Sequence, residues 1–338
     1  MATYGWIGLG NMGGPMTANI LAAGHRVQGF DLDPQALREA AERGVTTVGS
    51  VAEAVQGADV VFTMLPKGEH VRAVFDGDSG IWAHAAKSTL LVDSSTVDVE
   101  TSQFCHDESA RRGFQFVDAP VSGGISGAAA ATLAFMVGGE DDAVQKALDY
   151  IDPMAGKTIA AGGATTGISA KVCNNMMLFI NLMAAAEGSQ LADRLGLDPK
   201  VFWEIASVSS GRSWAQQTWY PMPGVIETAA ANNNYEATFR ADLALKDVTL
   251  ALNAGELTGV TLEAAQLAST KFQHLVDEGL GDKDCSLISK YVSPDGTAPG
   301  YRDEAQQTRG TAAADVATSA ADSAAPGKAP DHDAQGKA

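Results

Sequence analysis

The fold is decided by the stretch Tyr4-Gly5-Trp6-Ile7-Gly8-Leu9-Gly10-Asn11-Met12-Gly13. A helical run follows it, and then comes Arg26-Val27-Gln28-Gly29-Phe30-Asp31. This order predicts a strand, a tight glycine turn, a helix and a second strand that ends in a carboxylate. Such a unit is typical of an α/β domain built on a parallel sheet.

The glycine spacing also matches the loop that binds dinucleotides. Glycine permits the sharp turn, leaves room for a pyrophosphate and lets the helix pack closely on the strand, while the helix N-terminus attracts the phosphates. Asp31 lies 18 residues beyond Gly13, where an acidic side chain reaches the ribose hydroxyls. A plain glycine turn with a solvated Asp31 is the alternative. The predicted cofactor residues are Gly8, Leu9, Gly10, Asn11, Met12, Gly13 and Asp31.

Composition and charge narrow the class of protein. The 338 residues are 45% hydrophobic and carry a formal net charge of −18. This length suits two domains, and the acidity argues against binding to nucleic acid or to an anionic membrane. The three cysteines are far apart and show no disulfide or zinc spacing, which favours reduced thiols and a cytoplasmic protein. The first strand begins at once, so no targeting peptide is expected.

Strands and helices alternate through residues 1–163, which predicts a doubly wound sheet of the Rossmann type. The run 58–66 is almost continuously apolar, as in a parallel strand covered on both faces. Further strands are expected at 45–48, 89–93, 115–118, 132–137 and 158–161. The covering helices are expected at 12–23, 33–43, 51–56, 69–75, 99–112 and 142–151.

Beyond residue 163 the alternation stops. Helices are expected at 167–195, 199–207, 239–254 and 261–278, which makes 164–293 an all-helical domain. Residues 172–186 of the first helix are uncharged but include three asparagines, so a buried helix is expected and not a membrane span. Residues 294–338 contain no Leu, Ile, Phe or Trp and are expected to be a disordered tail.

Hydride transfer to a dinucleotide requires a group that takes up the hydroxyl proton. Lys171 is the best candidate, because it lies one turn into an apolar helix, where burial lowers a lysine pKa; a solvated lysine is the alternative. Asn175 lies on the same helix face. Ser122-Gly123-Gly124 offers a hydroxyl and N–H groups for a carboxylate, although its spacing alone favours an ordinary glycine loop. No histidine is expected near this cleft, and no metal-ligand spacing is found.

Four motifs together resemble the β-hydroxyacid dehydrogenase family, and within it the 3-hydroxyisobutyrate dehydrogenases. They are the glycine turn, Asp118-Ala119-Pro120-Val121-Ser122-Gly123-Gly124, the helix Gly167-Ile168-Ser169-Ala170-Lys171 with Asn174-Asn175, and Lys246-Asp247. The resemblance runs from Tyr4 to Tyr291. His70 departs from it, where that branch often has an asparagine, and so does the long tail.

The resemblance implies the NAD-linked oxidation of 3-hydroxyisobutyrate to methylmalonate semialdehyde, a step of valine breakdown. It implies Lys171 as the acid/base, and Leu65, Pro66, Thr96 and Lys246 as further cofactor-binding residues. Ser122, Gly123, Gly124 and Asn175 would hold the substrate, and no metal is implied. It also implies a homodimer or homotetramer formed through the helical domain.

Three other functions remain open from the sequence. A related enzyme acting on tartronate semialdehyde or another short β-hydroxy acid shares these motifs. An imine-reducing relative would usually have another residue in place of Lys171. A non-catalytic dinucleotide sensor would keep the glycine turn and Asp31 but would have no reason to keep Lys171 together with Asn175.

Overall fold

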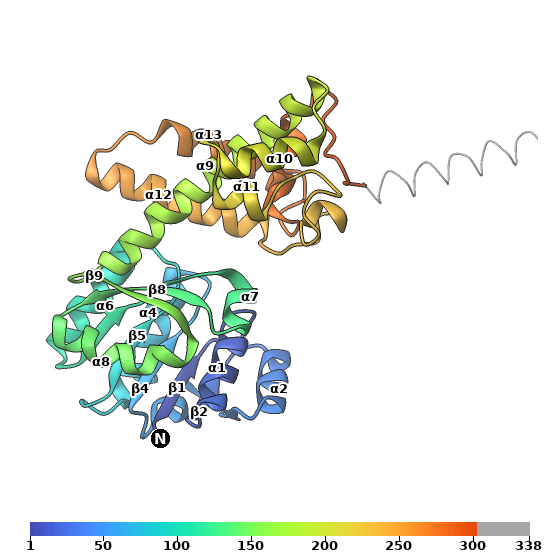
Figure 1. Ribbon diagram of the computed structural model, residues 1–338. Coiled ribbons are helices and arrows are strands. Elements are labelled where there is room, and N and C mark those ends of the chain that lie inside the picture. Colours follow the sequence, from blue (N-terminus) through green and yellow to red (C-terminus); the bar gives the residue numbers. More distant parts are fainter. Residues whose placement is uncertain (303–338) are drawn as a thin grey trace, which may run out of the picture.

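The computed structural model describes residues 1–302 and divides into a sheet half and a helical half, stacked one above the other in Figure 1. The helix α9, Thr166–Arg194, rises from the first half into the second. The two halves have separate cores, and α9 contributes side chains to both of them. This arrangement supports the proposed limits of 1–163 and 164–293 for the two domains.

The sheet is organised around β1, which lies between β2 and β4 and runs parallel to both. Its order is β3-β2-β1-β4-β5-β6-β8-β7, with β9 pairing on β8. All four residues of β4 are buried, as the apolar sequence of this strand predicts. The strands up to β6 are β1 Thr3–Ile7, β2 Arg26–Phe30, β3 Thr46–Thr47, β4 Val60–Thr63, β5 Leu90–Asp93 and β6 Gln115–Asp118.

The sheet is mixed at its far edge, because β8 runs antiparallel to β6 and to β7. The bounds are β7 Val121–Ser122, β8 Leu133–Gly139 and β9 Ala155–Gly162. Residues 119–124, which include the expected glycine loop at 122–124, therefore contain a short strand, and α7, Gly124–Ala129, follows it directly. Both elements are too short to leave a periodic signal in the sequence.

Helices cover both faces of the sheet, each face with its own apolar cluster. One cluster includes Trp6, Met16 and Phe135, and the other includes Phe75, Trp82 and Phe116. The single turn α5 was not predicted; its Ile81 and Trp82 are buried. The remaining helices are α1 Gly13–Ala22, α2 Pro34–Glu42, α3 Val51–Val55, α4 Gly68–Phe75, α5 Ile81–His84, α6 Val99–Arg111, α8 Asp141–Ile151 and the 3-10 turn η1 Asp152–Met154.

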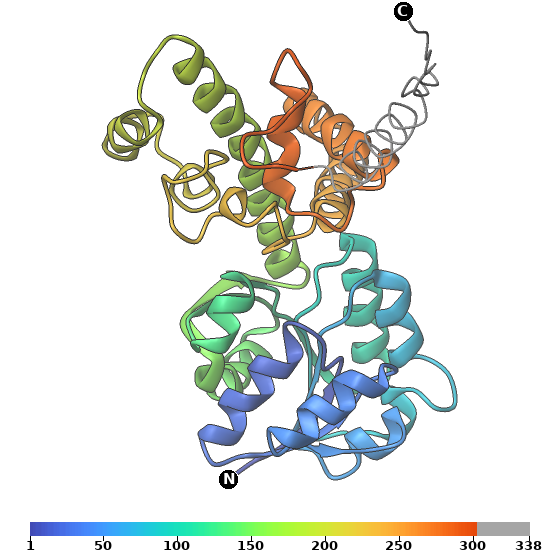
Figure 2. The same cartoon turned by 90° about the vertical axis from the view of Figure 1, so that its right-hand side faces the viewer.

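The helical half packs around the second part of α9, as the turned view in Figure 2 also shows. Its core contains Phe179 and Leu182 of α9 together with Phe272 and Leu275. The short helix α11 was not predicted. The elements are α10 Pro199–Val208, α11 Trp214–Thr218, η2 Ala230–Asn232, α12 Ala241–Thr258, α13 Glu263–Asp277 and η3 Cys285–Tyr291.

Within the described residues, α9 is the one helix that is long and apolar enough to cross a membrane. In the structure it contacts β8 and β9 at its start and α11, α12 and α13 further along. A shared core helix of a folded protein passes the same test of length and composition. The contacts fit the buried helix that the asparagines predict.

The segment expected to be a tail starts later than the sequence predicts. Residues 294–302 pack on the helical half: Ala298 is buried, and the Pro299 carbonyl accepts a hydrogen bond of 3.0 Å from the Tyr235 hydroxyl. Small side chains, backbone groups and one aromatic ring, that of Tyr301, which packs edge-on against Tyr235, dock this piece. Composition alone cannot reveal such a contact. The expectation is therefore corrected for 294–302, and the rest of the segment, 303–338, lies outside the described residues.

Candidate active site

The glycine turn between β1 and α1 has the geometry that its sequence requires. Gly8 has a φ of +97°, and a Cβ there would lie 2.2 Å from the Met64 carbonyl oxygen. A Cβ on Gly13 would lie 1.9 Å from the Gly8 carbonyl oxygen, so no larger residue fits. By contrast, a Cβ on Gly10 would meet no atom within 4 Å, so the turn opens to space at this point.

The first turn of α1 is the place where the pyrophosphate of a dinucleotide would lie. This turn has no acidic residue, and its N-cap residue, Met12, makes no side-chain cap hydrogen bond. The Gly14 N–H already donates to the Gly10 carbonyl oxygen at 2.9 Å, and Pro15 has no N–H, so an anion here would be held by the N–H groups that precede them. The helix dipole favours an anion at this place. Together with the open space at Gly10, these features fit the pyrophosphate of NAD.

Asp31 follows β2 directly and faces the turn. Its Oδ2 accepts a hydrogen bond of 2.6 Å from the Leu9 N–H, and its Oδ1 accepts one of 2.8 Å from the Asp33 N–H. Each carboxylate oxygen keeps a further lone pair for a ribose hydroxyl. Leu32, the next residue, is 89% exposed. The turn therefore fixes the direction of the Asp31 carboxylate while leaving the adjoining position free.

The loops after β4 and β5 are joined at the carboxyl edge of the sheet. The Leu65 N–H donates a hydrogen bond of 2.9 Å to Ser95 Oγ. Asp93 Oδ1 accepts hydrogen bonds from Thr63 Oγ1, at 2.7 Å, and from the Ser95 N–H, at 3.1 Å. Burial raises the pKa of the Asp93 carboxyl, against the lowering effect of these hydrogen bonds. Both loops are held at the edge where open α/β sheets bind ligands.

Lys246 reaches these loops from α12 in the other half of the molecule. Its Nζ donates a hydrogen bond of 2.8 Å to the Thr96 carbonyl oxygen and one of 3.3 Å to the Pro66 carbonyl oxygen. Asp247 Oδ1 lies 3.2 Å from the same nitrogen. The structure therefore brings Lys246 together with Thr96 and Pro66, which precede it in the sequence by 150 and 180 positions.

Lys171 and Asn175 lie on the buried face of α9 beside this group. Lys171 is 8% exposed, and burial lowers its pKa to about 8, while Asp247 raises it and Lys246 lowers it. Asn175 Nδ2 donates a hydrogen bond of 2.6 Å to Asp247 Oδ2. The lowered pKa that the apolar sequence predicts is thus found, and it allows Lys171 to exchange a proton near neutral pH.

Ser122, Gly123 and Gly124 lie at the junction of β7 and α7. Among the described residues, no hydrogen bond joins them to Lys171 or Asn175. They are linked to α9 through β8, because the Met136 N–H donates to the Pro120 carbonyl oxygen at 3.1 Å and the Met136 carbonyl lies against Gly167.

Three residues near Lys171 were not identified as functional residues from the sequence. Asp247 was singled out only with Lys246, yet it is 4% exposed and is bonded to Asn175. Asp118 was only the first residue of a motif, and His106 was placed away from the cleft. In the structure, His106 Nε2 lies 2.7 Å from Asp118 Oδ1, beside the start of α9. In the described residues no group of three His, Cys, Asp or Glu side chains is arranged to hold a metal.

Comparison with family models assigns both halves of the chain. Residues 3–163 match a model described as the NAD binding domain of 6-phosphogluconate dehydrogenase. Residues 165–292 match a model described as the NAD-binding of NADP-dependent 3-hydroxyisobutyrate dehydrogenase. The boundary between the two models lies next to the beginning of α9.

Curated relatives and solved structures agree with these matches. A probable 3-hydroxyisobutyrate dehydrogenase of Mycobacterium bovis is 46% identical over 77% of this chain and 88% of its own length. An NAD-dependent L-serine dehydrogenase of Pseudomonas aeruginosa is 39% identical over 87% of this chain and 99% of its own. The solved 3-hydroxyisobutyrate dehydrogenase of Mycobacterium tuberculosis with L-serine is 42% identical, with a TM-score of 0.81 over 86% of this chain and 99% of that one.

Proposed function

The chain belongs to the β-hydroxyacid dehydrogenase family, and on that premise we propose that it oxidises 3-hydroxyisobutyrate to methylmalonate semialdehyde with NAD. The family relationship makes it an NAD-dependent oxidoreductase. The substrate is our inference, and valine breakdown is the pathway it would serve. The observation that carries the oxidation chemistry is the buried Lys171, which lies beside the hydrogen-bonded pair of Asn175 and Asp247 at the carboxyl edge of a dinucleotide-binding sheet.

The chemistry assigned to Lys171 follows from its surroundings. When the substrate alcohol is oxidised, its O–H proton passes to the Lys171 amine, and bound NAD supplies the acceptor for the hydride that leaves the carbon. The amine must be neutral to accept the proton, and a pKa of about 8 provides a substantial neutral fraction at physiological pH. Asp247 orients Asn175 and balances the nearby positive charges.

We assign the substrate carboxylate to the loop Ser122-Gly123-Gly124 and to Asn175. The loop supplies a hydroxyl and backbone N–H groups, and Asn175 an amide nitrogen beside Lys171. The cofactor roles are assigned to Gly8, Leu9, Gly10, Asn11, Met12, Gly13 and Asp31, and to Leu65, Pro66, Thr96 and Lys246. The last of these already bonds to the loops that would cover the nicotinamide side.

L-Serine is a second candidate substrate, favoured by two relatives whose names include it. It is also a 3-hydroxy acid and carries an amino group where 3-hydroxyisobutyrate has a methyl group. Tartronate semialdehyde reduction remains a further alternative within the same chemistry. All three substrates place a hydroxyl or carbonyl oxygen at a fixed distance from a carboxylate, which is what the proposed site recognises.

A panel of short hydroxy acids tests this proposal. We expect NAD reduction with 3-hydroxyisobutyrate at a kcat/KM at least about 10-fold above that with L-serine, because the ammonium of L-serine loses hydration where a methyl group loses none, which costs roughly 1–3 kcal/mol. Steady-state absorbance of NADH measures it, with the reverse reaction run on tartronate semialdehyde. A reversed order would assign L-serine instead, and no turnover of any substrate would refute the proposal.

We propose that the chain forms a homo-oligomer through the α9–α10 patch, an exposed apolar set on the helical half. Large apolar patches on folded domains mark contact surfaces, and a second copy is the occupant implied by the family resemblance. The apolar stretch 176–186 of α9 is less suitable as a contact surface, since its Phe179, Leu182 and Ala186 belong to the core of the helical half. The patch consists of Leu191, Leu195, Leu197, Val201, Ile205 and Val208.

Charges placed in the α9–α10 patch should therefore separate the subunits. Val201 and Ile205 lie one turn apart on α10 and are 48% and 51% exposed, so Val201→Glu with Ile205→Glu should not disturb the monomer. Light scattering after gel filtration is expected to show a dimer or tetramer for the parent and a monomer for the double variant. Ile159→Glu, on β9, is the matched control and should keep the parent mass. A monomeric parent would contradict the proposal.

The cytoplasm is our proposal for the location. Cys105 and Cys285 are buried and unpaired, and Cys173 is exposed and free, which suits a reducing compartment. A dehydrogenase there also draws directly on the NAD pool.

A further inference from the structure

The helix that carries Lys171 starts in an unusual way. Its N-cap residue, Thr165, has a φ of +66°, a left-handed conformation that non-glycine residues seldom adopt, and its side chain makes no cap hydrogen bond. Such a conformation costs free energy and persists only where the surroundings hold it. The first N–H groups of α9 must then find partners outside the helix.

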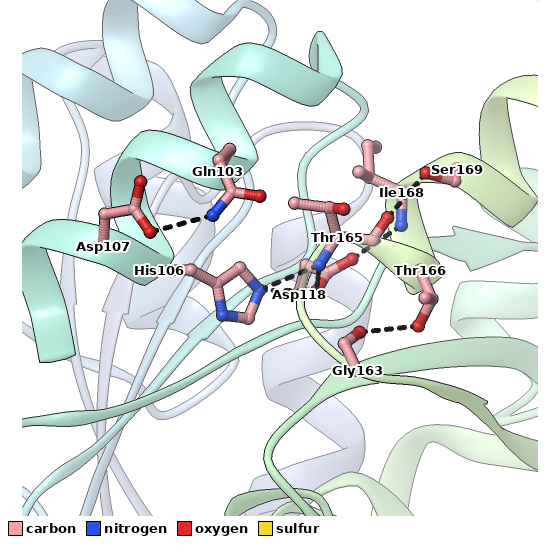
Figure 3. Close-up of polar contacts among 9 residues, drawn as sticks. All are labelled: Gln103, His106, Asp107, Asp118, Gly163, Thr165, Thr166, Ile168 and Ser169. Atoms are coloured by element: carbon pink, nitrogen blue, oxygen red, sulfur yellow. Dashed lines mark hydrogen bonds and ion pairs between the residues drawn. The ribbon is translucent and has the colours of Figure 1, made fainter.

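Asp118, at the end of β6, supplies these partners from another part of the chain. Its Oδ2 accepts a hydrogen bond of 2.7 Å from the Ile168 N–H, and its Oδ1 accepts one of 3.1 Å from the Thr165 N–H. Figure 3 shows the carboxylate lying across the opening turn of α9. A carboxylate at this place also interacts favourably with the positive end of the helix dipole.

His106 holds this carboxylate from the opposite side. Its Nε2 lies 2.7 Å from Asp118 Oδ1 (Figure 3). The His106 ring also packs edge-on against Phe116, at 4.7 Å between centroids. The side chains of His106 and Asp118 are only 9% and 3% exposed. A buried carboxylate needs its lone pairs satisfied, and the His106 tautomer with its proton on Nε2 donates to Asp118. The Thr165 N–H, which lies 3.3 Å from the same Nε2, then donates to Asp118 Oδ1.

The same turn is pressed onto the sheet by close backbone packing. A Cβ on Gly167 would lie 2.4 Å from the Met136 carbonyl oxygen and 2.6 Å from the Asp118 carbonyl oxygen. Lys171 comes three residues after Ile168, in the next turn of the same helix. Any shift or rotation of the opening turn is therefore passed on to the Lys171 amine.

We propose that His106 and Asp118 are positioning residues that clamp the first turn of α9 and so set the place of the Lys171 amine over the cofactor site. The kinetic part of this proposal rests on the function proposed above for Lys171. The clamp itself is a property of the fold and can be tested without turnover. Neither side chain touches substrate or cofactor in this assignment.

Backbone exchange tests the clamp directly. We expect Asp118→Asn and His106→Leu to speed amide hydrogen exchange in the peptide that covers 165–170, measured by mass spectrometry on the intact folded protein. Asparagine replaces one acceptor oxygen by a donor, and leucine removes the Nε2–H. His25→Leu is the matched control, because it removes another histidine that makes a hydrogen bond: His25 Nδ1 accepts from the Ala2 N–H, far from α9. That variant should leave exchange at 165–170 unchanged.

Kinetics test the link to Lys171. A displacement of the acid/base by about 1 Å costs on the order of 10²-fold, so we expect kcat to fall about 10-fold in His106→Leu and about 10²-fold in Asp118→Asn. The dissociation constant for NAD should stay within about twofold of the parent, because the glycine turn is untouched. His106→Gln keeps an N–H near the Nε2 position and should recover most of the kcat and restore slow exchange.

The outcomes separate the two proposals. Unchanged exchange at 165–170 in both clamp variants would overturn the clamp, whatever the activity. Faster exchange with an unchanged kcat would overturn the positioning role. Equal losses of kcat in His106→Gln and His106→Leu would also overturn it. A parent that oxidises no hydroxy acid would refute the proposed function, while exchange would still decide the clamp.

Discussion

Replacing Lys171 by alanine is expected to lower kcat by about 10²–10⁴-fold, the usual effect of losing a general acid/base. NAD binding should persist, because the glycine turn and Asp31 lie in the other half of the molecule. Lys171→Arg should not restore activity, since guanidinium keeps its proton near neutral pH. Stopped-flow and steady-state measurements with 3-hydroxyisobutyrate and with L-serine check both variants. Turnover of either substrate at the parent rate would remove Lys171 from the mechanism.

The pH dependence gives an independent readout of the same residue. Oxidation needs the neutral amine, so kcat/KM should rise as pH increases through about 8 and then level off. Lys171→Ala should lack this ionisation.

The pH dependence of the free energy of unfolding gives a separate test of the burial of Lys171. The folded pKa of Lys171 lies below its ordinary value of 10.5, so the unfolded chain binds more protons between about pH 8 and 10.5. The free energy of unfolding should therefore rise with pH between about 8 and 10.5 and should be lower below about pH 8. Lys171→Met removes the buried amine and should be more stable than the parent at pH 7, by up to roughly 3 kcal/mol. Urea unfolding at pH 7 and at pH 10 tests the sign, and a less stable Lys171→Met would contradict the burial argument.

Cofactor choice should be reversed by two changes beside the glycine turn. The parent is expected to prefer NAD over NADP by about 10²-fold in kcat/KM, since the Asp31 carboxylate repels a 2′-phosphate and roughly 3 kcal/mol is at stake in charged hydrogen bonds. Asp31→Asn with Leu32→Arg should favour NADP. Asparagine still accepts from the Leu9 N–H, and arginine at the exposed position 32 pairs with the phosphate.

Leu32→Arg alone is the matched control for this reversal. It should raise the rate with NADP while keeping a preference for NAD, because Asp31 is intact. Initial rates with both cofactors at a saturating hydroxy acid are sufficient. Equal efficiency of the parent with NADP and NAD would show that Asp31 does not discriminate between them.

Regular elements were predictable wherever one local rule determined them. The unbroken apolar run of β4 predicted a strand covered on both faces, and all its residues are buried. The glycine turn required a sharp reversal and a close helix contact, and Gly8 and Gly13 have them. The apolar helix around Lys171 predicted a buried side chain with a lowered pKa. Lys171 is buried in the structure, and burial lowers its pKa to about 8.

Features that depend on distant residues were not predictable. The capping of α9 by Asp118 and His106 joins three separate segments, and no spacing in the sequence connects them. The bond from Lys246 to the Pro66 carbonyl spans 180 positions and depends on how the halves dock. Residues 294–302 contain a single aromatic side chain, that of Tyr301, so composition gave no sign that Tyr235 holds them. Short elements such as β7 and α11 are set by their neighbours and not by their own residues.

The continuity of α9 limits how the molecule moves. This helix has 29 residues without a proline, and it enters both halves with its first turn fixed to the sheet. Helices bend sharply at prolines or at breaks in their hydrogen bonding, and domain hinges need residues whose backbone angles can change. The two halves are therefore expected to travel as one rigid body. Ligand entry and product release are then expected to depend on movements of loops and not on opening of the domains.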